Sequence, residues 1–137
     1  MSLETERANR RLLRARDTMD RCYAEPLDIP GLAQIACVSE AHFIRTFHRT
    51  FGETPHRYLQ RRRVERSMFL LRETGRSITE ICFDVGFSSL GTYSRTFREI
   101  MGETPSAYRK RSQVKGVPTC FAMAWTRPSS FGEAQSD

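Results

Sequence analysis

Through most of the chain, apolar residues recur at the three- and four-residue spacing of amphipathic helices rather than at every second position. The clearest case is formed by Phe43, Phe47 and Phe51, which place one ring on each successive turn of a helix. Ser39 before them and Gly52 after them are residue types that favour the two ends of a helix. The pattern therefore predicts a helix between Ser39 and Gly52, with its phenylalanine face buried.

The same reading predicts six further helices and gives no strand pattern before residue 117. Proline, serine and glycine mark most of the boundaries, because proline and serine start helices and glycine ends them. We therefore expect an all-α fold with about seven helices. The predicted helices cover residues 7–23, 31–36, 40–51, 55–73, 78–84, 89–101 and 105–112.

Two segments, 32–59 and 81–109, repeat one design. The Arg-Thr-Phe run at 45–47 and the Gly-Glu-Thr-Pro run that follows it both recur 50 residues later. Residues upstream recur at an offset of 49, so the second copy has one more residue between its first and second helices. Each copy is a helix, a short turn and a second helix, which predicts a helix-turn-helix motif. Two similar surfaces suit a repetitive partner such as duplex DNA.

This organisation predicts one tandem domain, in which a long linker helix joins two helix-turn-helix subdomains. The linker helix holds 19 residues, or about 28 Å of length, and successive major grooves on one face of DNA lie about 34 Å apart. One chain is therefore expected to bind DNA as a monomer at two sites one helical turn apart, a dimer being the alternative. The predicted boundaries are 1–112 for the domain, about 8–54 and 76–112 for the subdomains, and about 55–73 for the linker helix.

Residues 113–137 differ from the rest in composition, with several glycines, prolines and serines and no net charge. Phe121, Met123 and Trp125 alternate with other residues, as in a short strand. We expect this tail either to dock on the domain or to be disordered, with contact to a second chain as a further alternative.

Charge narrows the class of partner. The 137 residues include 22 Lys and Arg against 16 Asp and Glu, a formal net charge of +6, and most of the basic residues are arginines. A basic chain favours an acidic partner, and arginine makes bidentate contacts with phosphates and guanine edges. An arginine-rich codon usage accounts for the same count equally well. No secretory segment and no apolar run of membrane-spanning length occurs, so we expect a cytoplasmic protein without membrane contact.

The chain carries no pattern typical of a metal centre or a catalytic site. Cys22, Cys37, Cys82 and Cys120 form no CxxC pair, and with the three histidines they make no zinc spacing. We interpret them as small buried apolar groups or as free thiols, with Cys37 and Cys82 at core positions. No carboxylate pair and no Ser/His/Asp grouping stands out, so we expect neither an enzyme nor a cofactor.

The helices predicted over 40–51 and 89–101 turn a polar face away from their apolar stripes. Arg45 and Arg95 occupy equivalent points of the repeat, where an arginine can donate two hydrogen bonds to guanine O6 and N7. A single exposed arginine is more often solvated or ion-paired, but two at equivalent points favour a shared role. The outward faces with their flanks comprise Ala41, His42, Ile44, Arg45, His48 and Arg49 in the first copy, and Gly91, Thr92, Ser94, Arg95, Arg98 and Glu99 in the second.

Several residues of these helices have two interpretations. His42 and His48 either contact DNA or are solvated, and Ile44 either touches a thymine methyl group or shields the edge of the core. Leu90 is expected to project toward the core. For a group of arginines on the long helix, phosphate contact and a solvated face are equally well supported interpretations. These arginines are Arg57, Arg61, Arg62, Arg63 and Arg66.

The two copies resemble the DNA-binding domain of AraC/XylS-type transcriptional regulators over about residues 8–112. The resemblance rests on SEAHFIRTFHRTFGETPHRYL in the first copy and on ITEICFDVGFSSLGTYSRTFREIMGETPSAYR in the second. It implies a seven-helix bacterial activator or repressor of transcription, associated with the nucleoid, with double-stranded DNA and RNA polymerase as partners. It also implies base contacts from Ala41, Ile44 and Arg45 in the first recognition helix, and from Gly91, Thr92, Ser94 and Arg95 in the second.

The sequence departs from that family in three respects, of which Cys82 in place of the usual alanine is the smallest, because both residues are small. Leu90 and Gly91 stand where polar residues are frequent, and the chain holds no separate effector-binding domain of the kind that most members carry. It therefore resembles either the small stand-alone members or a fragment of a larger effector-responsive regulator. A protein-interaction module is the remaining alternative. An enzyme of the DNA-repair methyltransferase type, to which this domain is sometimes fused, would need an activated cysteine.

Overall fold

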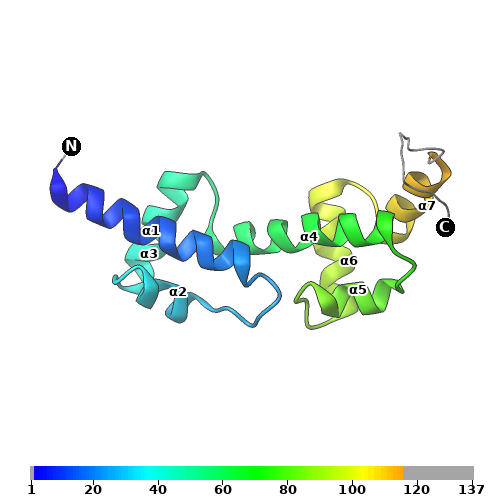
Figure 1. Cartoon of the computed structure of the whole chain (residues 1–137), viewed down its shortest axis with the longest axis horizontal. Coiled ribbons are helices and arrows are strands. Elements are labelled where there is room, and N and C mark those ends of the chain that lie inside the picture. The colour runs from blue at the N-terminus through cyan, green and yellow to red at the C-terminus, as the bar shows by residue number, and fades with distance from the viewer. Residues whose placement is uncertain (1, 116–137) are drawn as a thin grey trace. The chain divides into compact units, whose positions relative to one another are not determined.

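The computed structural model describes residues 2–115, and in that range the chain consists of seven α-helices without strands (Figure 1). The expected all-α fold with about seven helices is confirmed. The helices predicted over 40–51, 55–73 and 78–84 have the expected ends. In chain order the helices are α1 (Leu3–Arg21), α2 (Ile29–Ile35), α3 (Glu40–Phe51), α4 (Pro55–Glu73), α5 (Ile78–Asp84), α6 (Leu90–Met101) and α7 (Pro105–Lys115).

The first and last helices are longer than the sequence pattern indicated. α1 begins at Leu3 because the Ser2 hydroxyl accepts a hydrogen bond from the Thr5 backbone N–H at 3.1 Å, and acidic residues in the first turn add to this stabilisation. α7 continues to Lys115, three residues past its expected end. The domain boundary predicted at residue 112 therefore falls inside a helix.

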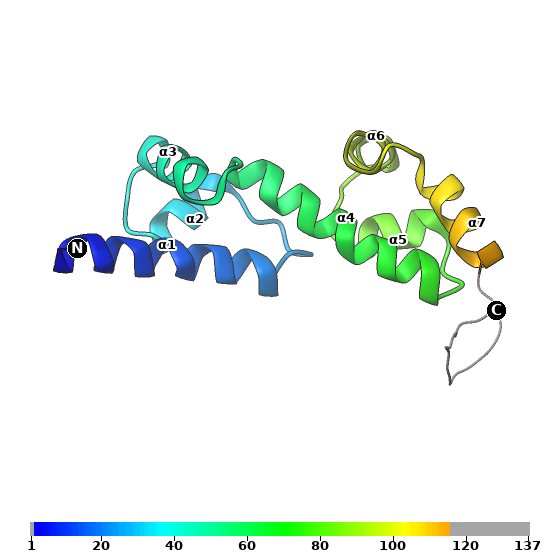
Figure 2. The ribbon, with the colours of Figure 1, turned by 90° about the horizontal axis from the view of Figure 1, so that it is seen from above.

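The chain divides after Arg63 into two compact units, and α4 contributes to both. The core of the first unit lies among α1, α2 and α3 (Figure 2). Phe43 and Phe47 of α3 are fully buried with ring centroids 5.6 Å apart, which confirms the predicted burial of this face. Phe51 is partly buried and packs on Phe47 with 4.6 Å between ring centroids. The other core residues are Leu12, Ala15, Met19, Leu32, Ala33, Ala36 and Leu59.

The second unit repeats this core. Tyr93 and Phe97 of α6 are fully buried at the positions equivalent to Phe43 and Phe47, and their ring centroids lie 5.8 Å apart. The second half of α4 supplies buried side chains to this unit, as α1 does to the first. The remaining buried residues are Val64, Ser67 and Leu71 of α4, Ile81 and Cys82 of α5, Val85 and Phe87 of the turn, Thr96 of α6, and Pro105 and Tyr108 of α7.

The turns of the two helix-turn-helix motifs differ in length by one residue, as the sequence offsets predicted. Each contains one residue with positive φ, Cys37 at 60° in the first copy and Gly86 at 107° in the second. The expected core position of Cys37 is wrong, because the chain needs a left-handed residue here and the side chain is exposed. Cys82 is buried as expected. Cys120, like the rest of the predicted tail beyond residue 115, lies outside the described residues.

α3 and α6 each end at a left-handed glycine, Gly52 and Gly102. Gly52 after α3 has a φ of 82°, so Gly52→Ala should cost about 1–2 kcal/mol of folding free energy, even though an added Cβ would meet no atom within 4 Å. Gly75 is the matched control, because its Cβ position is equally open but its φ is not positive. Gly75→Ala should be neutral or stabilise by up to about 1 kcal/mol. Equal free energies of unfolding in urea for the two variants would contradict this.

Candidate nucleic-acid interface

α3 turns the predicted face to solvent. Its first turn is fixed by Ser39, whose hydroxyl accepts a hydrogen bond from the His42 backbone N–H at 3.2 Å. Because Phe43 and Phe47 are buried, the opposite side of the helix must point outward. The residues predicted for this side are all exposed, namely Ala41, His42, Ile44, Arg45, His48 and Arg49.

α6 presents the equivalent side in the second unit. Gly91, Arg95 and Arg98 are exposed, whereas Thr92 and Ser94 are partly buried. The Thr92 hydroxyl lies 2.9 Å from the Ser89 hydroxyl and is therefore engaged within the first turn of the helix. The predicted residues thus lie on one outward helix face in each unit.

Arg45 and Arg95 occupy equivalent positions on these two faces, and both are exposed. Neither guanidinium makes a hydrogen bond, an ion pair or an aromatic contact with any residue in the range 2–115. A structural salt bridge, the alternative role for an exposed arginine, is thus absent from the described part of the chain. Both guanidiniums are available to a partner.

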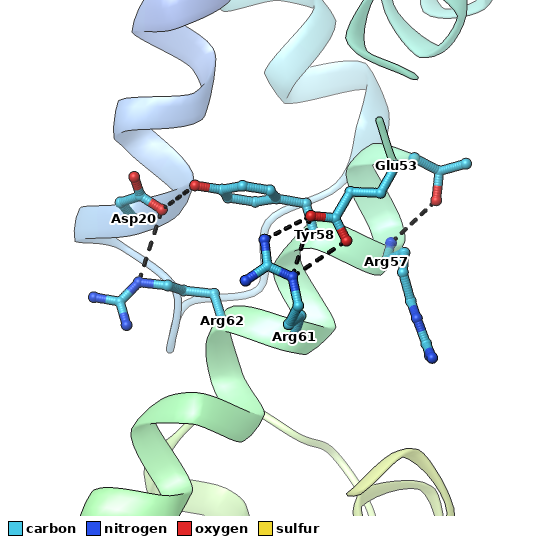
Figure 3. A network of polar contacts seen from close by, with 7 residues as sticks. Asp20, Glu53, Arg57, Tyr58, Arg61 and Arg62 are labelled. Carbon is cyan, nitrogen blue, oxygen red and sulfur yellow. Dashed lines mark hydrogen bonds and ion pairs between the residues drawn. The ribbon is translucent and has the colours of Figure 1, made fainter. Parts of the chain in front are cut away.

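The arginines of α4 differ, because most of them are engaged within the protein (Figure 3). Arg61 forms an ion pair with Glu53 at 2.6 Å, and Arg62 lies 3.7 Å from the carboxylate of Asp20. Arg66 stacks over a neighbouring phenylalanine ring at 4.8 Å. From the sequence, phosphate contact and a solvated face were the two roles expected for these arginines. The structure shows a third role, which is to form contacts within the fold, as Arg61 and Arg62 do with carboxylates.

Arg63 ties the segment after α1 to α4. Its guanidinium donates hydrogen bonds to the backbone carbonyls of Tyr23 at 2.6 Å and Glu25 at 2.8 Å. Burial lowers the pKa of Arg63, but an arginine stays protonated at physiological pH. Arg109 plays the same part in the second unit, where it donates to two carbonyls at the C-terminal end of α4, both at 3.1 Å.

The start of α4 is held by a clamp made of Glu53, Tyr58 and Arg61 (Figure 3). The Arg61 guanidinium bridges Glu53 and the Tyr58 ring, whose centroid lies 5.2 Å away. The Tyr58 hydroxyl donates a hydrogen bond to Asp20 of α1 at 2.7 Å. Burial, followed by this hydrogen bond, raises the pKa of Tyr58 to about 12, so the hydroxyl remains a donor at neutral pH.

An equivalent clamp of Glu103, Tyr108 and Arg111 lies 50 residues later at the start of α7. Arg111 forms an ion pair with Glu103 at 2.5 Å and lies 5.4 Å from the ring centroid of Tyr108. The Tyr108 hydroxyl accepts a hydrogen bond from Arg72 at 2.8 Å. Neither clamp was predicted from the sequence. The repeat of Glu53 and Arg61 as Glu103 and Arg111, 50 residues later, could have indicated them.

Leu90 does not project toward the core, so the sequence expectation is wrong. Its side chain is 41% exposed at the first position of α6. The core beside it is occupied by Phe87 and Tyr93, which are both buried with ring centroids 5.2 Å apart. Leu90 is therefore part of the surface next to the outward face.

Other kinds of site find little support in the range 2–115. These residues include no group of three His, Cys, Asp or Glu that could hold a metal ion, and none of their helices is long and apolar enough to cross a membrane. Burial raises the pKa of the Cys82 thiol, whereas a nucleophilic cysteine needs a lowered pKa. Cys82 is thus a core residue.

A family model described as a helix-turn-helix domain matches residues 32–111, which is more than half of the chain. Solved structures with the same fold include AraC-type DNA-binding domains. The chain belongs to the AraC-type helix-turn-helix family. This is a family of DNA-binding domains of transcription regulators, not of enzymes.

Among solved structures similar to this AraC-type chain is the DNA-binding domain of AdpA, a global transcriptional factor, in complex with a target DNA. It is 27% identical with a TM-score of 0.75, and the match covers 78% of this chain and 96% of that chain. An AraC-type regulator from Chromobacterium violaceum is 30% identical with a TM-score of 0.70, covering 79% and 96% of the two chains.

Curated relatives of this AraC-type chain are much longer. An uncharacterized HTH-type transcriptional regulator from Haemophilus influenzae is 38% identical over 61 residues, which make up 44% of this chain and 20% of that protein. The matched segments span 20% to 25% of the curated relatives.

Because Arg63 is hydrogen-bonded within the fold and Arg45 is not, their removal should affect stability to different extents. Arg63→Ala should lower the free energy of unfolding by about 1.5 kcal/mol or more, because it removes the charged donor from the partly buried carbonyl of Tyr23 as well as from the exposed carbonyl of Glu25. Arg45→Ala removes no contact within residues 2–115 and should change stability by less than about 0.5 kcal/mol. Chemical denaturation of both variants measures the difference. A destabilised Arg45→Ala variant would show that this side chain has an internal role after all.

Proposed function

We propose that this chain is the sequence-specific DNA-binding part of a bacterial transcriptional regulator. Each unit places one recognition helix, α3 or α6, in a major groove of double-stranded DNA. The observation that carries the proposal is the pair of guanidiniums without partners in the described structure, Arg45 and Arg95, at equivalent points of two exposed helix faces. The DNA complex of the similar AdpA domain supports the choice of partner.

Arginine suits this role because its planar guanidinium can donate two hydrogen bonds to O6 and N7 of guanine. An arginine that is already ion-paired, as Arg61 is with Glu53, would have to break that contact first. Arg45 and Arg95 break no ion pair or hydrogen bond within residues 2–115 when they bind a base. The full strength of each bidentate contact is thus available to distinguish guanine from the other bases.

The residues around each arginine complete the contact surface. Small residues at the first turn of each helix let the backbone come close to the bases, and the 39% exposed side chain of Ile44 can contact a thymine methyl group. The remaining histidines, arginines and hydroxyl residues can donate hydrogen bonds to bases or phosphates. We assign to this surface Ala41, His42, Ile44, Arg45, His48 and Arg49 of α3, and Gly91, Thr92, Ser94, Arg95 and Arg98 of α6.

One chain binds, as a monomer, two different DNA elements about one helical turn apart. α4 supports this proposal, because it is a single helix of 19 residues that contributes to both units. Its length is about 28 Å, against about 34 Å between successive major grooves on one face of DNA. Because α3 and α6 carry different outward side chains, the two elements differ in sequence.

A role in transcription regulation would involve RNA polymerase as well as DNA. The curated relatives are named HTH-type transcriptional regulators, and we assign this chain to the same activity in the bacterial cytoplasm, at the nucleoid, with activation through contact with RNA polymerase. The DNA-binding domain runs to the end of α7 at Lys115 rather than to residue 112, because a boundary inside α7 would cut a helix.

The proposal predicts that Arg45→Ala and Arg95→Ala each weaken specific DNA binding. Each should cost about 1–3 kcal/mol of affinity for a duplex selected by the wild type, with a smaller loss on unrelated DNA, because a bidentate base contact is removed. Titration with labelled duplexes measures both affinities. Arg14→Ala is the matched control, because Arg14 is exposed on α1 and its loss removes the same charge outside the recognition helices. Wild-type specific affinity in both recognition variants, or an equal loss in the control, would refute the assignment.

A further inference from the structure

The first turn of α6 is apolar where the first turn of α3 is not. Leu90 stands at the position that Glu40 holds in α3, and Gly91 stands at the position of Ala41. Leu90 leaves 41% of its surface exposed and is not part of the core. The start of α6 therefore presents to solvent a leucine side chain next to a bare backbone carbon.

The fold itself gives no reason for a glycine at position 91. Its φ is not positive, so the backbone conformation is open to any residue. A Cβ built on it would meet no atom within 4 Å, so nothing within the described structure excludes a side chain. Glycine also stabilises a helix less than alanine does. A partner that approaches the helix closely would account for a glycine at this position.

The side-chain hydroxyls of this turn are hydrogen-bonded within the turn. The Ser89 hydroxyl accepts a hydrogen bond from the Thr92 backbone N–H at 3.2 Å, and it lies 2.9 Å from the Thr92 hydroxyl. Gly91 precedes Arg95 by one turn on the same side of the helix. A partner held by Arg95 would thus meet the Leu90 side chain and the open backbone of Gly91 one turn earlier.

We infer that Leu90 and Gly91 bind the methyl group of a thymine, beside the base that Arg95 contacts. This inference rests on the proposed entry of α6 into the major groove. The thymine C5-methyl is the apolar substituent that a base pair presents in that groove. The Leu90 side chain contacts this methyl group. The methyl group lies in the space that is open because Gly91 has no side chain. Glu40 at the equivalent position of α3 offers no such contact, so a thymine contact from the first residue of the helix is expected only in the element read by α6.

The test replaces single thymines in a selected duplex by deoxyuridine, which lacks only the methyl group. The α6 element is the one whose base preference is lost in Arg95→Ala. With the full chain, one deoxyuridine in this element should weaken binding roughly fourfold, the factor that corresponds to one buried methyl group. Deoxyuridine at other positions of the α6 element should have a smaller effect.

Two variants with matched controls connect this effect to the residues. Leu90→Gln and Gly91→Ala should bind the thymine duplex more weakly than the wild type and should no longer distinguish thymine from deoxyuridine. Leu13→Gln and Gly75→Ala should behave as the wild type does, because Leu13 is similarly exposed at 45% on α1 and Gly75 has an equally open Cβ position. All four variants should stay folded, because none of the four residues is buried.

The inference is overturned if the α6 element contains no thymine that responds to deoxyuridine, or if Leu90→Gln keeps the wild-type response. Arg95→Ala distinguishes this failure from a failure of the proposed function. If Arg95→Ala still weakens specific binding, α6 reads DNA and only the thymine contact is wrong. If Arg95→Ala has no effect on any selected duplex, α6 does not read bases and both proposals fall.

Discussion

Burial of an aromatic stripe on each recognition helix is the constraint on which the rest of each unit depends. Phe43 and Phe47 have no exposed surface in the first unit, and Tyr93 and Phe97 have none in the second. Truncating such a buried ring typically costs about 3–5 kcal/mol, a large part of the stability of a small domain. The helices therefore cannot rotate about their axes, and the side opposite the stripe must face outward.

The distribution of arginine contacts separates structural residues from residues available to DNA. Arg61 and Arg111 are held in their clamps, and Arg63 and Arg109 bind backbone carbonyls. The ion pairs of the clamps are partly exposed, so they contribute little to folding stability. Their effect is mainly to fix how the chain leaves α3 and α6. Net charge alone could not have made this distinction, because every arginine counts equally in it.

Local signals predicted the helices well. Phe43, Phe47 and the caps at Ser39 and Gly52 are close in sequence, and so they determine α3 without help from the rest of the chain. The outward faces were predictable for the same reason, because they are the complement of a buried stripe. Whether Arg45 contacts a base stays a prediction, since it depends on a partner that the sequence does not contain.

The sequence-based expectations were incomplete or wrong where contacts and exposure depend on the three-dimensional structure. The Arg61–Glu53 ion pair spans the end of one helix and the second turn of the next, a spacing that helix periodicity does not detect. Cys37 is exposed because the turn needs a left-handed residue. Leu90 is exposed because Phe87 occupies the core beside it, which a helical wheel starting at Leu90 cannot show.

The central claim, that two different recognition helices of one chain read bases, is tested most directly by selecting bound duplexes from random DNA. The account predicts enrichment of two dissimilar elements, each containing guanine, with centres about 10 base pairs apart. Elements separated by about half a helical turn more should not be enriched, because they would lie on opposite faces of the duplex. Enrichment of a single element, or of no sequence above the starting pool, would contradict the account.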